Sequence, residues 1–351
     1  TYHEQTDMDN IRKLREVLKT LPAFAKDYFR AIEPTTSTKT RISYAYDIRI
    51  FFQFLISQNP SLAKIGIPNL NVSVLDQLKP IDIEEYMEYL KLYDSPNDQT
   101  TITNGERGLK RKISSLRSFY TYYYKRQAIE TNPVQLVDMP KIHDKAIIRL
   151  DAGETAALLD YIEHCGDQLT GQRKAYYEKT KLRDLAIVTL LLGTGIRVSE
   201  CVGLDVEDID FRNNGIRLIR KGGSEMVVYF GPEVEKALKD YLEARKAISP
   251  LEGHEHALFY STQRKRIGVQ AVENLVKKYA RAITTTKKIT PHKLRSTYGT
   301  TLYQETGDIY LVADVLGHKD VNTTKKHYAA MDDARRRKAA TAIRLREDYE
   351  D

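Results

Sequence analysis

The residues best suited to chemistry gather near the end of the chain. The stretch PHKLRSTYGTTLYQETGDIYLVADVLGHKDVNTTKKHY, residues 291–328, contains His292 and Arg295, then His318 and Tyr328. It has no cysteine, and its acids do not stand at a familiar metal-ligand spacing from its histidines. Any reaction of these side chains must therefore use arginine, histidine and tyrosine without a metal.

Two more basic residues stand in the stretches GTGIRVSE and, further on, GIRLIRKGGSE. Arg197 follows a glycine break, where backbone can approach a ligand closely, and Lys221 stands beside a Gly-Gly turn. A guanidinium group can bind two phosphate oxygens at once, in a bidentate manner, and stabilises the extra charge of a phosphoryl-transfer transition state. A tyrosine oxygen can attack phosphorus, and a lysine can protonate the departing alkoxide. The set predicts phosphoryl transfer with Tyr328 as nucleophile and with neither a metal nor another cofactor.

Taken one at a time, these residues have ordinary structural explanations. An arginine after a glycine turn is more often an ion-pair partner, and a lysine at a hairpin end is usually solvated. The chain holds 23 tyrosines, so Tyr328 must be chosen from many. The order and spacing of the whole set, rather than any single member, carry the prediction.

The composition narrows the class of partner. The chain has 351 residues and a formal net charge of +7, which fits two domains and favours a polyanion such as nucleic acid. Its two cysteines, Cys165 and Cys201, follow neither a disulfide nor a zinc pattern, so a reducing cytoplasm is expected. No apolar run reaches the length of a membrane span, which predicts no association with a membrane.

Residues 1–140 predict a helical, basic domain. In TSTKTRISYAYDIRIFFQFL, apolar residues recur at helical spacing and leave Lys39 and Arg41 off that face. One helix is expected around residues 81–92 and a longer one over residues 101–126. The apolar stripe of the longer helix consists of Leu109, Ile113, Leu116, Tyr120 and Tyr123.

The helix expected over residues 101–126 carries few acids and many cations. Its basic residues include Arg107, Lys110, Arg111 and Arg117. A lysine–arginine face on one helix is usually only solvated, but the scarcity of acids favours contacts with phosphates. We therefore expect these four residues, together with Lys39 and Arg41, to bind DNA.

A linker and a second domain are expected after residue 140. NPVQLVDMPKIHDK, at residues 132–145, interrupts the helical periodicity with two prolines, so the domain boundary is placed there. Asp151 and Glu154 fit a capping box, two strand-like runs flank a Gly-Gly turn, and Pro291 fits the first position of a helix. The expected fold class is mostly α with a small β-hairpin or sheet: a helical domain followed by a mixed α/β domain.

Together these motifs resemble those of the tyrosine recombinase (phage integrase) family over nearly the whole chain. TGIRVSECVGLDVEDID is similar to the family's first-arginine motif, with Arg197 as the arginine and Glu200 as its supporting acid. RKGGSE resembles the hairpin that carries the family lysine, here Lys221. The H-x-x-R motif, LGHKD and the nucleophile segment TTKKHYAAM give His292, Arg295, His318 and Tyr328.

The resemblance implies a site-specific DNA recombinase. Tyr328 would attack a phosphate of double-stranded DNA, leaving a 3′-phosphotyrosine link and a free 5′-hydroxyl. The 5′-hydroxyl of another strand would then attack that link, so bond energy is kept and no cofactor is implied. A homotetramer would exchange strands between two recombination sites through a Holliday junction.

The resemblance also implies a layout, closest to that of Xer recombinases that work as a single protein. Residues 1–140 would form the core-binding domain, with residues 1–38 as an extension, and residues 141–331 the catalytic domain. Residues 332–351 would be a tail. Small apolar residues recur in it at near-helical spacing, which predicts a final helix. The alternative is that this helix folds back on its own domain, and the resemblance favours docking on a neighbouring protomer.

Two other functions would use parts of the same pattern. A type IB topoisomerase would use this chemistry to relax DNA as a monomer, and a non-catalytic regulator would only bind DNA. The complete residue set argues against the regulator, and the helical core-binding domain and the tail argue against the topoisomerase. Resolution of chromosome dimers and integration or excision of a mobile element both stay open, as does the target sequence.

Overall fold

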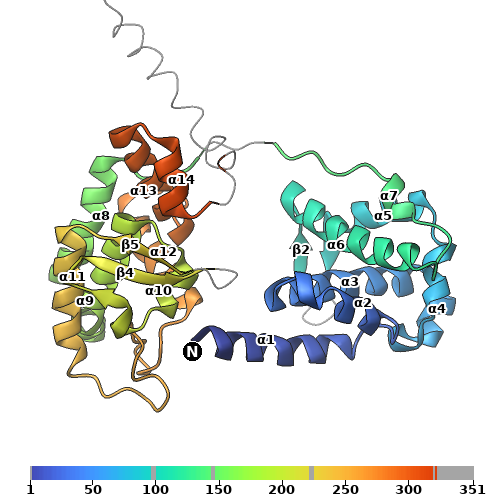
Figure 1. The fold of residues 1–351 in the computed structure, drawn as a ribbon, viewed down its shortest axis with the longest axis horizontal. Helices are drawn as coiled ribbons and strands as arrows, with labels where there is room; N and C mark the ends of the chain where they lie inside the picture. Colours follow the sequence, from blue (N-terminus) through green and yellow to red (C-terminus); the bar gives the residue numbers. More distant parts are fainter. Residues whose placement is uncertain (1, 96–99, 144–146, 221–224, 319–320, 322–351) are drawn as a thin grey trace, which may run out of the picture. The chain divides into compact units, whose positions relative to one another are not determined.

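The computed structural model describes residues 2–95, 100–143, 147–220, 225–318 and 321 (Figure 1). Residue contacts divide the chain into two units, residues 1–145 and residues 146–351. Helices dominate both units, and each unit also contains one small antiparallel sheet. The expected fold class, mostly α with a small β component, is confirmed. Among the described residues, no helix combines the length and the apolar character that crossing a membrane requires.

The first unit is a set of helices around an aromatic core. Its elements are α1 (Tyr2–Leu18), α2 (Ala25–Ala31), η1 (Glu33–Thr35), α3 (Thr38–Gln58), α4 (Pro60–Ile65), η2 (Ile67–Asn69), η3 (Val72–Gln77), α5 (Pro80–Tyr89), β1 (Leu92–Asp94), β2 (Thr101–Thr103), α6 (Glu106–Lys125) and α7 (Pro133–Leu136). The core stripe expected in the longer helix is confirmed, because all five of its residues are buried in α6. Edge-to-face contacts between rings, such as that of Phe52 with Phe119, join α3 to α6.

The start of α6 corrects the predicted helix over residues 101–126. Thr101–Thr103 form β2, which pairs antiparallel with β1, and Ile102 lies opposite Tyr93. Three β-branched residues in a row favour a strand over a helix. Gly105 then precedes the first turn, so α6 begins at Glu106.

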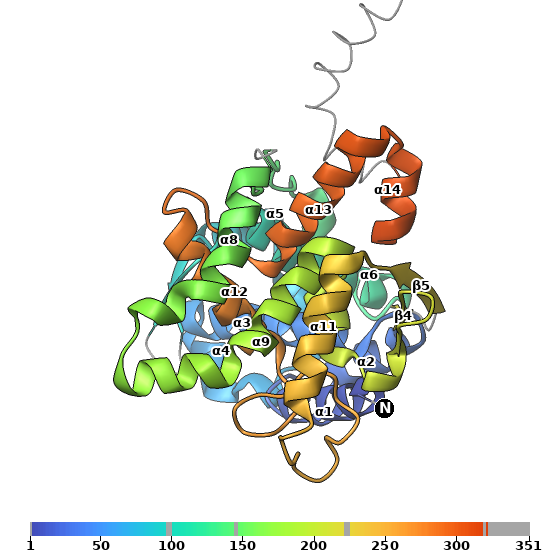
Figure 2. The same cartoon turned by 90° about the vertical axis from the view of Figure 1, so that its left-hand side faces the viewer.

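The second unit is built around the long helix α9. Its elements are α8 (Ala152–His164), η4 (Cys165–Gln168), α9 (Gly171–Thr194), α10 (Val198–Gly203), η5 (Val206–Asp208), β3 (Ile209–Asp210), β4 (Gly215–Ile219), β5 (Glu225–Tyr229), α11 (Pro232–Arg245), α12 (Val269–Ile283), α13 (Pro291–Thr306) and α14 (Ile309–Leu316). α8, α11 and α13 all contact α9 (Figure 2). Residues 186–191 of α9 are buried without a break, as a helix covered by neighbours on all sides requires.

Local signals in the sequence fix several of these elements. Asp151 accepts the amide of Glu154 at 2.8 Å, and Glu154 accepts that of Asp151 at 2.9 Å, so the predicted capping box starts α8. α9 ends where Gly195 adopts a left-handed conformation, φ 63°. The expected hairpin is formed by β4 and β5, and the short β3 adds a third strand that the sequence did not predict.

Candidate active site

The site is organised around the C-terminal end of α14. Gly317 is left-handed, with φ 60°. The amides of Gly317 and His318 donate to the carbonyls of Asp314 at 2.8 Å and Ala313 at 2.9 Å. This is a Schellman ending, which glycine favours. A helix cannot satisfy its own last carbonyls, so those of residues 315–317 need donors from elsewhere.

Three arginines from separate parts of the unit donate to these three carbonyls in turn. Arg220, which directly follows β4, donates Nη2 to the carbonyl of Val315 at 2.9 Å. Arg295 of α13 donates to the next carbonyl, and Arg197, which precedes α10, donates to the one after it at 3.3 Å. The negative end of the helix dipole favours guanidinium groups at this position. We call Arg197, Arg220 and Arg295 the arginine cluster.

Arg295 is the most deeply buried member of the cluster. It is 5% exposed, and its guanidinium donates to the carbonyls of Gly195 and Leu316. Gly195 faces the ring of Tyr298 so closely that a Cβ would clash with it. Main-chain carbonyls orient a guanidinium but do not neutralise its charge, so these two bonds leave the positive charge of Arg295 in place.

Arg197 is held by a carboxylate as well as by a carbonyl. Its Nη1 donates to Oε1 of Glu200 at 2.8 Å, and its amide donates to Oε2 of the same residue at 2.7 Å. Glu200 is buried, whereas the Arg197 side chain is 39% exposed. Glu200 therefore fixes both ends of Arg197 and leaves part of its guanidinium accessible.

Arg220 is the site residue that the sequence analysis missed. Its side chain is 10% exposed, and its Nε lies 3.8 Å from Oε1 of Glu200. Burial lowers the pKa of Arg220 below its ordinary value, and Glu200 opposes that shift. A basic residue beside a hairpin turn is usually solvated. The only signal in the sequence is its position directly before Lys221.

The two histidines belong to elements that also contribute arginine contacts. His292 is exposed in the first turn of α13, three residues before Arg295. His318 is partly buried and directly follows Gly317, so its position is set by the Schellman ending. Both histidines therefore stand on backbone that the arginine cluster holds.

The predicted catalytic residues are thus only partly placed by the structure. It brings Arg197, Glu200 and Arg295 together around the turn that carries His318. Lys221 and Tyr328 lie outside the described residues.

The basic residues expected to bind DNA fall into two groups. Lys39 and Arg107 are exposed and Lys110 is partly buried. Within the described ranges, the side chains of these three residues have no ionic or hydrogen-bonding partner. Their charge therefore remains available for phosphates.

The other three expected DNA contacts are committed to partners inside the first unit. Arg41 is buried and pairs with Glu33 at 2.9 Å. Arg111 pairs with both oxygens of the buried Asp47. Arg117 donates to the carbonyls of Val134 at 3.1 Å and Val137 at 2.9 Å. Each of these three arginines therefore has a partner that helps to hold the first unit together, and Arg111 remains 49% exposed beside Asp47. That they bind DNA stays a prediction.

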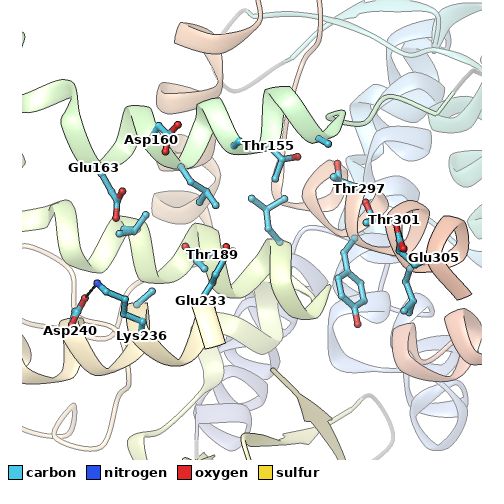
Figure 3. A pocket seen from close by; sticks show the side chains of 18 residues that line it. Thr155, Asp160, Glu163, Thr189, Glu233, Lys236, Asp240, Thr297, Thr301 and Glu305 are labelled. Carbon is cyan, nitrogen blue, oxygen red and sulfur yellow. Dashed lines mark hydrogen bonds and ion pairs between the residues drawn. The ribbon is translucent and has the colours of Figure 1, made fainter. Parts of the chain in front are cut away.

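A hollow of about 700 Å³ lies between α8, α9, α11 and α13 (Figure 3). Its apolar lining includes Leu159, Leu185, Leu192, Ala237 and Leu302. The acids that line it are Asp160, Glu163, Glu233, Asp240 and Glu305, all exposed. Among the described residues that line it, Lys236 is the only basic one, and it pairs with Asp240 at 2.7 Å. The hollow therefore has an apolar lining that is surrounded by acidic side chains.

Residues 149–335 match the phage integrase family. The chain is 33% identical to tyrosine recombinase XerC of Caldanaerobacter subterraneus subsp. tengcongensis, over 92% of this chain and 87% of that protein. It is 30% identical to tyrosine recombinase XerS of Streptococcus equi subsp. zooepidemicus, over 90% and 93% respectively. The chain belongs to the phage integrase family of tyrosine recombinases.

Solved structures of similar fold include two recombinases bound to DNA. One is the XerH site-specific recombinase bound to palindromic difH substrate in a post-cleavage complex, with TM-score 0.61, 19% identity, and coverage of 87% of this chain and 79% of that chain. The other is the Tn1549 transposon integrase in complex with transposon right end DNA, with TM-score 0.63, 21% identity, and coverage of 90% and 98%. The prediction of an enzyme for site-specific DNA recombination is confirmed, and neither the topoisomerase nor the non-catalytic regulator is favoured.

Proposed function

We propose that Arg197 and Arg295 of the arginine cluster bind the scissile phosphate of a DNA recombination site and that Tyr328 attacks it. The observation that carries this proposal is the set of three guanidinium groups anchored on three consecutive carbonyls. Among the described residues, Glu200 pairs with Arg197 and lies near Arg220, and the carboxylate of Asp314 also acts on Arg220, so three guanidinium groups face two carboxylates and a formal excess of positive charge stays at the site. Phosphoryl transfer needs such positive charge at fixed positions, because negative charge is spread over the non-bridging phosphate oxygens in the transition state.

Each proposed catalytic residue then has one task. Arg197, Arg295 and His318 bind the non-bridging oxygens, while Glu200 orients Arg197. Tyr328 Oη forms the bond to phosphorus as the bond to the 5′-oxygen breaks, and Lys221 gives that oxygen its proton. His292 either accepts the proton of the Tyr328 hydroxyl or positions the tyrosine.

DNA binding is proposed for both units. Recombinases of similar fold have been solved with DNA, XerH with difH substrate among them. In the first unit we propose that Lys39, Arg107 and Lys110 contact phosphates, because their side chains are the ones left without partners among the described residues. We place the reaction in the cytoplasm, since Cys165 and Cys201 are free and buried.

A suicide substrate with a nick beside the cleavage site tests the nucleophile. Tyr328→Phe removes the attacking oxygen and keeps the ring, so no covalent adduct should form while DNA affinity stays within a few-fold. Tyr310→Phe is the matched control, because Tyr310 is another tyrosine of the second unit and is 71% exposed on α14. It should cleave at the parent rate. An adduct with Tyr328→Phe, or its loss with Tyr310→Phe, would show that the assignment is wrong.

We further propose a homotetramer on DNA in which the tail of one protomer enters the acidic hollow of the next. Residues 334–346 read ARRRKAATAIRLR, which contains six basic residues and no acid. The hollow offers the opposite charge around an apolar lining. The tail lies outside the described residues, so complementarity of charge and hydrophobicity supports this part of the proposal.

Truncation and charge reversal test the tail together. Deleting residues 334–351 should spare binding to a single DNA site and weaken both assembly on two sites and recombination. Changing Asp160 and Glu163 to Lys should weaken assembly in the same way, because both line the hollow. Gel shift with one and with two sites measures both effects. A truncated protein that assembles and recombines at the parent rate would rule out this use of the tail.

A further inference from the structure

Arg220 has no role assigned by the sequence motifs, yet it is one of the most enclosed charges of the second unit. Its side chain is 10% exposed, and its Nη2 donates to the carbonyl of Val315, which lies 95 residues further along the chain, at 2.9 Å. Removing a guanidinium from water is costly, and the nearest carboxylate is already bonded to Arg197. A buried guanidinium does not add to solubility, so its presence at this position calls for another explanation.

Glu200 is shared between Arg220 and Arg197. Its Oε1 accepts Nη1 of Arg197 at 2.8 Å and faces Nε of Arg220 at 3.8 Å. Its Oε2 accepts the amide of Arg197 at 2.7 Å. Because one oxygen faces both guanidinium groups, the position of Arg220 limits where the carboxylate, and with it Arg197, can lie.

Gly317 shows how closely Arg220 fits against the turn after α14. A Cβ added to Gly317 would coincide with the Arg220 guanidinium. The carbonyl oxygen of Gly317 accepts Arg197. One residue therefore receives Arg220 against its Cα and binds Arg197 through its oxygen. Space for Arg220 is a second reason for glycine here, in addition to the left-handed φ of 60°.

We propose that Arg220 is a positioning residue for DNA cleavage. It holds Glu200 and the 315–317 turn in the arrangement that presents Arg197 to the phosphate, and it does not touch the DNA itself. The inference rests on the proposed role of Arg197 as a phosphate ligand. It adds a third arginine, which acts by positioning Arg197 and the turn that Arg295 also contacts.

Substitution at Arg220 should slow the chemical step more than it weakens binding. With saturating nicked suicide substrate, Arg220→Ala should lower the single-turnover cleavage rate about 10- to 100-fold, because small displacements of a transition-state ligand have effects of this size. The dissociation constant for DNA should change less than about three-fold, since Arg220 is not a phosphate contact. Arg220→Lys keeps the charge but not the planar fork, so its rate should lie between those of Arg220→Ala and the parent.

Arg217 provides the matched control, on β4, the strand that Arg220 directly follows. It is exposed and pairs with Asp208 at 3.1 Å, away from the carbonyls of the turn. Arg217→Ala should cleave at the parent rate. Equal losses in Arg217→Ala and Arg220→Ala would mean that the strand, rather than the contacts of Arg220, sets the rate.

The chemistry of the defect separates positioning of Arg197 from an effect on the neighbouring Lys221. A 5′-bridging phosphorothiolate has a leaving group that needs no proton, so it restores cleavage when only proton donation is impaired. Arg220→Ala should stay slow on this substrate, as Arg197→Ala should. Restoration of the parent rate in Arg220→Ala would overturn the proposal.

A double-mutant cycle with Gly317 tests the contact directly. In the parent, Gly317→Ala places a methyl group where the Arg220 guanidinium lies, so it should slow cleavage at least as much as Arg220→Ala. In the Arg220→Ala background that clash is gone and only the left-handed backbone penalty remains, so the additional loss should be several-fold smaller. Additive effects would overturn the proposal. If Tyr328→Phe still formed the adduct, the proposed function would fail, whereas a parent rate in Arg220→Ala beside an inactive Tyr328→Phe would remove this inference alone.

Discussion

Asp47 in the first unit and Glu200 in the second each lie buried between two basic side chains, and the two clusters differ in the charge that remains. Asp47 is 1% exposed and joins α3 to α6. Both of its oxygens accept Arg111, and Lys112 approaches one of them at 3.3 Å. The carboxylate is the partner of both cations, so their charge serves the contact between two helices.

Around Glu200 the balance is different. Arg197 and Arg220 lie near this carboxylate, and these two arginines and Arg295 all donate to main-chain carbonyls. A carbonyl fixes the direction of a guanidinium without cancelling its charge, whereas a carboxylate does both. The comparison teaches that the partners of a cluster as a whole matter more than its burial: cations matched by a carboxylate hold the fold, whereas a group of guanidinium groups held largely by carbonyls keeps charge for a phosphate.

The largest expected effect comes from removing the carboxylate of the first cluster. Asp47→Asn leaves Lys112, which is 7% exposed, without its charged partner. Breaking a buried pair from one side typically lowers the free energy of unfolding by about 3–5 kcal/mol. Urea unfolding followed by circular dichroism measures this loss, and cleavage by the folded variant at saturating DNA should match the parent.

The pH dependence of that variant follows from Lys112. Burial lowers the pKa of Lys112, and Asp47 opposes the shift, so Asp47→Asn lowers this pKa further. As pH rises through the lowered pKa, the folded protein binds fewer protons than the unfolded protein, and stability therefore increases. The deficit of Asp47→Asn should shrink from neutral to alkaline pH. Glu16→Gln is the control, because its pair with Lys19 is exposed and should contribute less than about 1 kcal/mol.

The second effect tests the other cluster. Arg197→Ala should lower the single-turnover cleavage rate by roughly 10²–10³, or about 3–4 kcal/mol of transition-state stabilisation. The free energy of unfolding should change less than in Asp47→Asn, since Arg197 is 39% exposed. A 5′-bridging phosphorothiolate should restore cleavage by Lys221→Ala but not by Arg197→Ala. Equal restoration of both would contradict the roles proposed for the two residues.

Much of the second cluster could be predicted because its positions are fixed by local signals. The glycine after α9 precedes Arg197, Pro291 starts the helix of Arg295, and Gly317 ends α14. Each signal acts within a few residues, so helix ends and the residues beside them are readable. β1 and β2 have three residues each and β3 has two, which is too short for alternation to reveal them.

What the sequence could not provide was the partner of each arginine. Arg220 meets Val315 across 95 residues, and Arg111 meets Asp47 across 64. Before the helices are packed, an internal arginine and a phosphate-binding arginine look alike, because both stand off the apolar stripe of a helix or beside a turn. This is why Arg41, Arg111 and Arg117 were expected to bind DNA and Arg220 was overlooked.

Arg117 tests the comparison of the two clusters most directly, and its substitution is expected to have the smallest effect of all. Its guanidinium donates to the carbonyls of Val134 and Val137, so by partner type it resembles the second cluster although it lies in the first unit. We expect it to fasten α7 and the residue after it to α6, because the same Nη2 donates to both carbonyls. Arg117→Ala should therefore leave the dependence of DNA affinity on salt unchanged.

Changing Lys39, Arg107 and Lys110 to Ala should lower the log–log salt slope by roughly one unit for each phosphate that these side chains neutralise. Fluorescence anisotropy over a range of salt concentrations measures both slopes. A slope that falls for Arg117→Ala would show that carbonyl-held arginines of the helical unit also serve DNA, and an unchanged slope in the triple variant would mean that the exposed cations are only solvated.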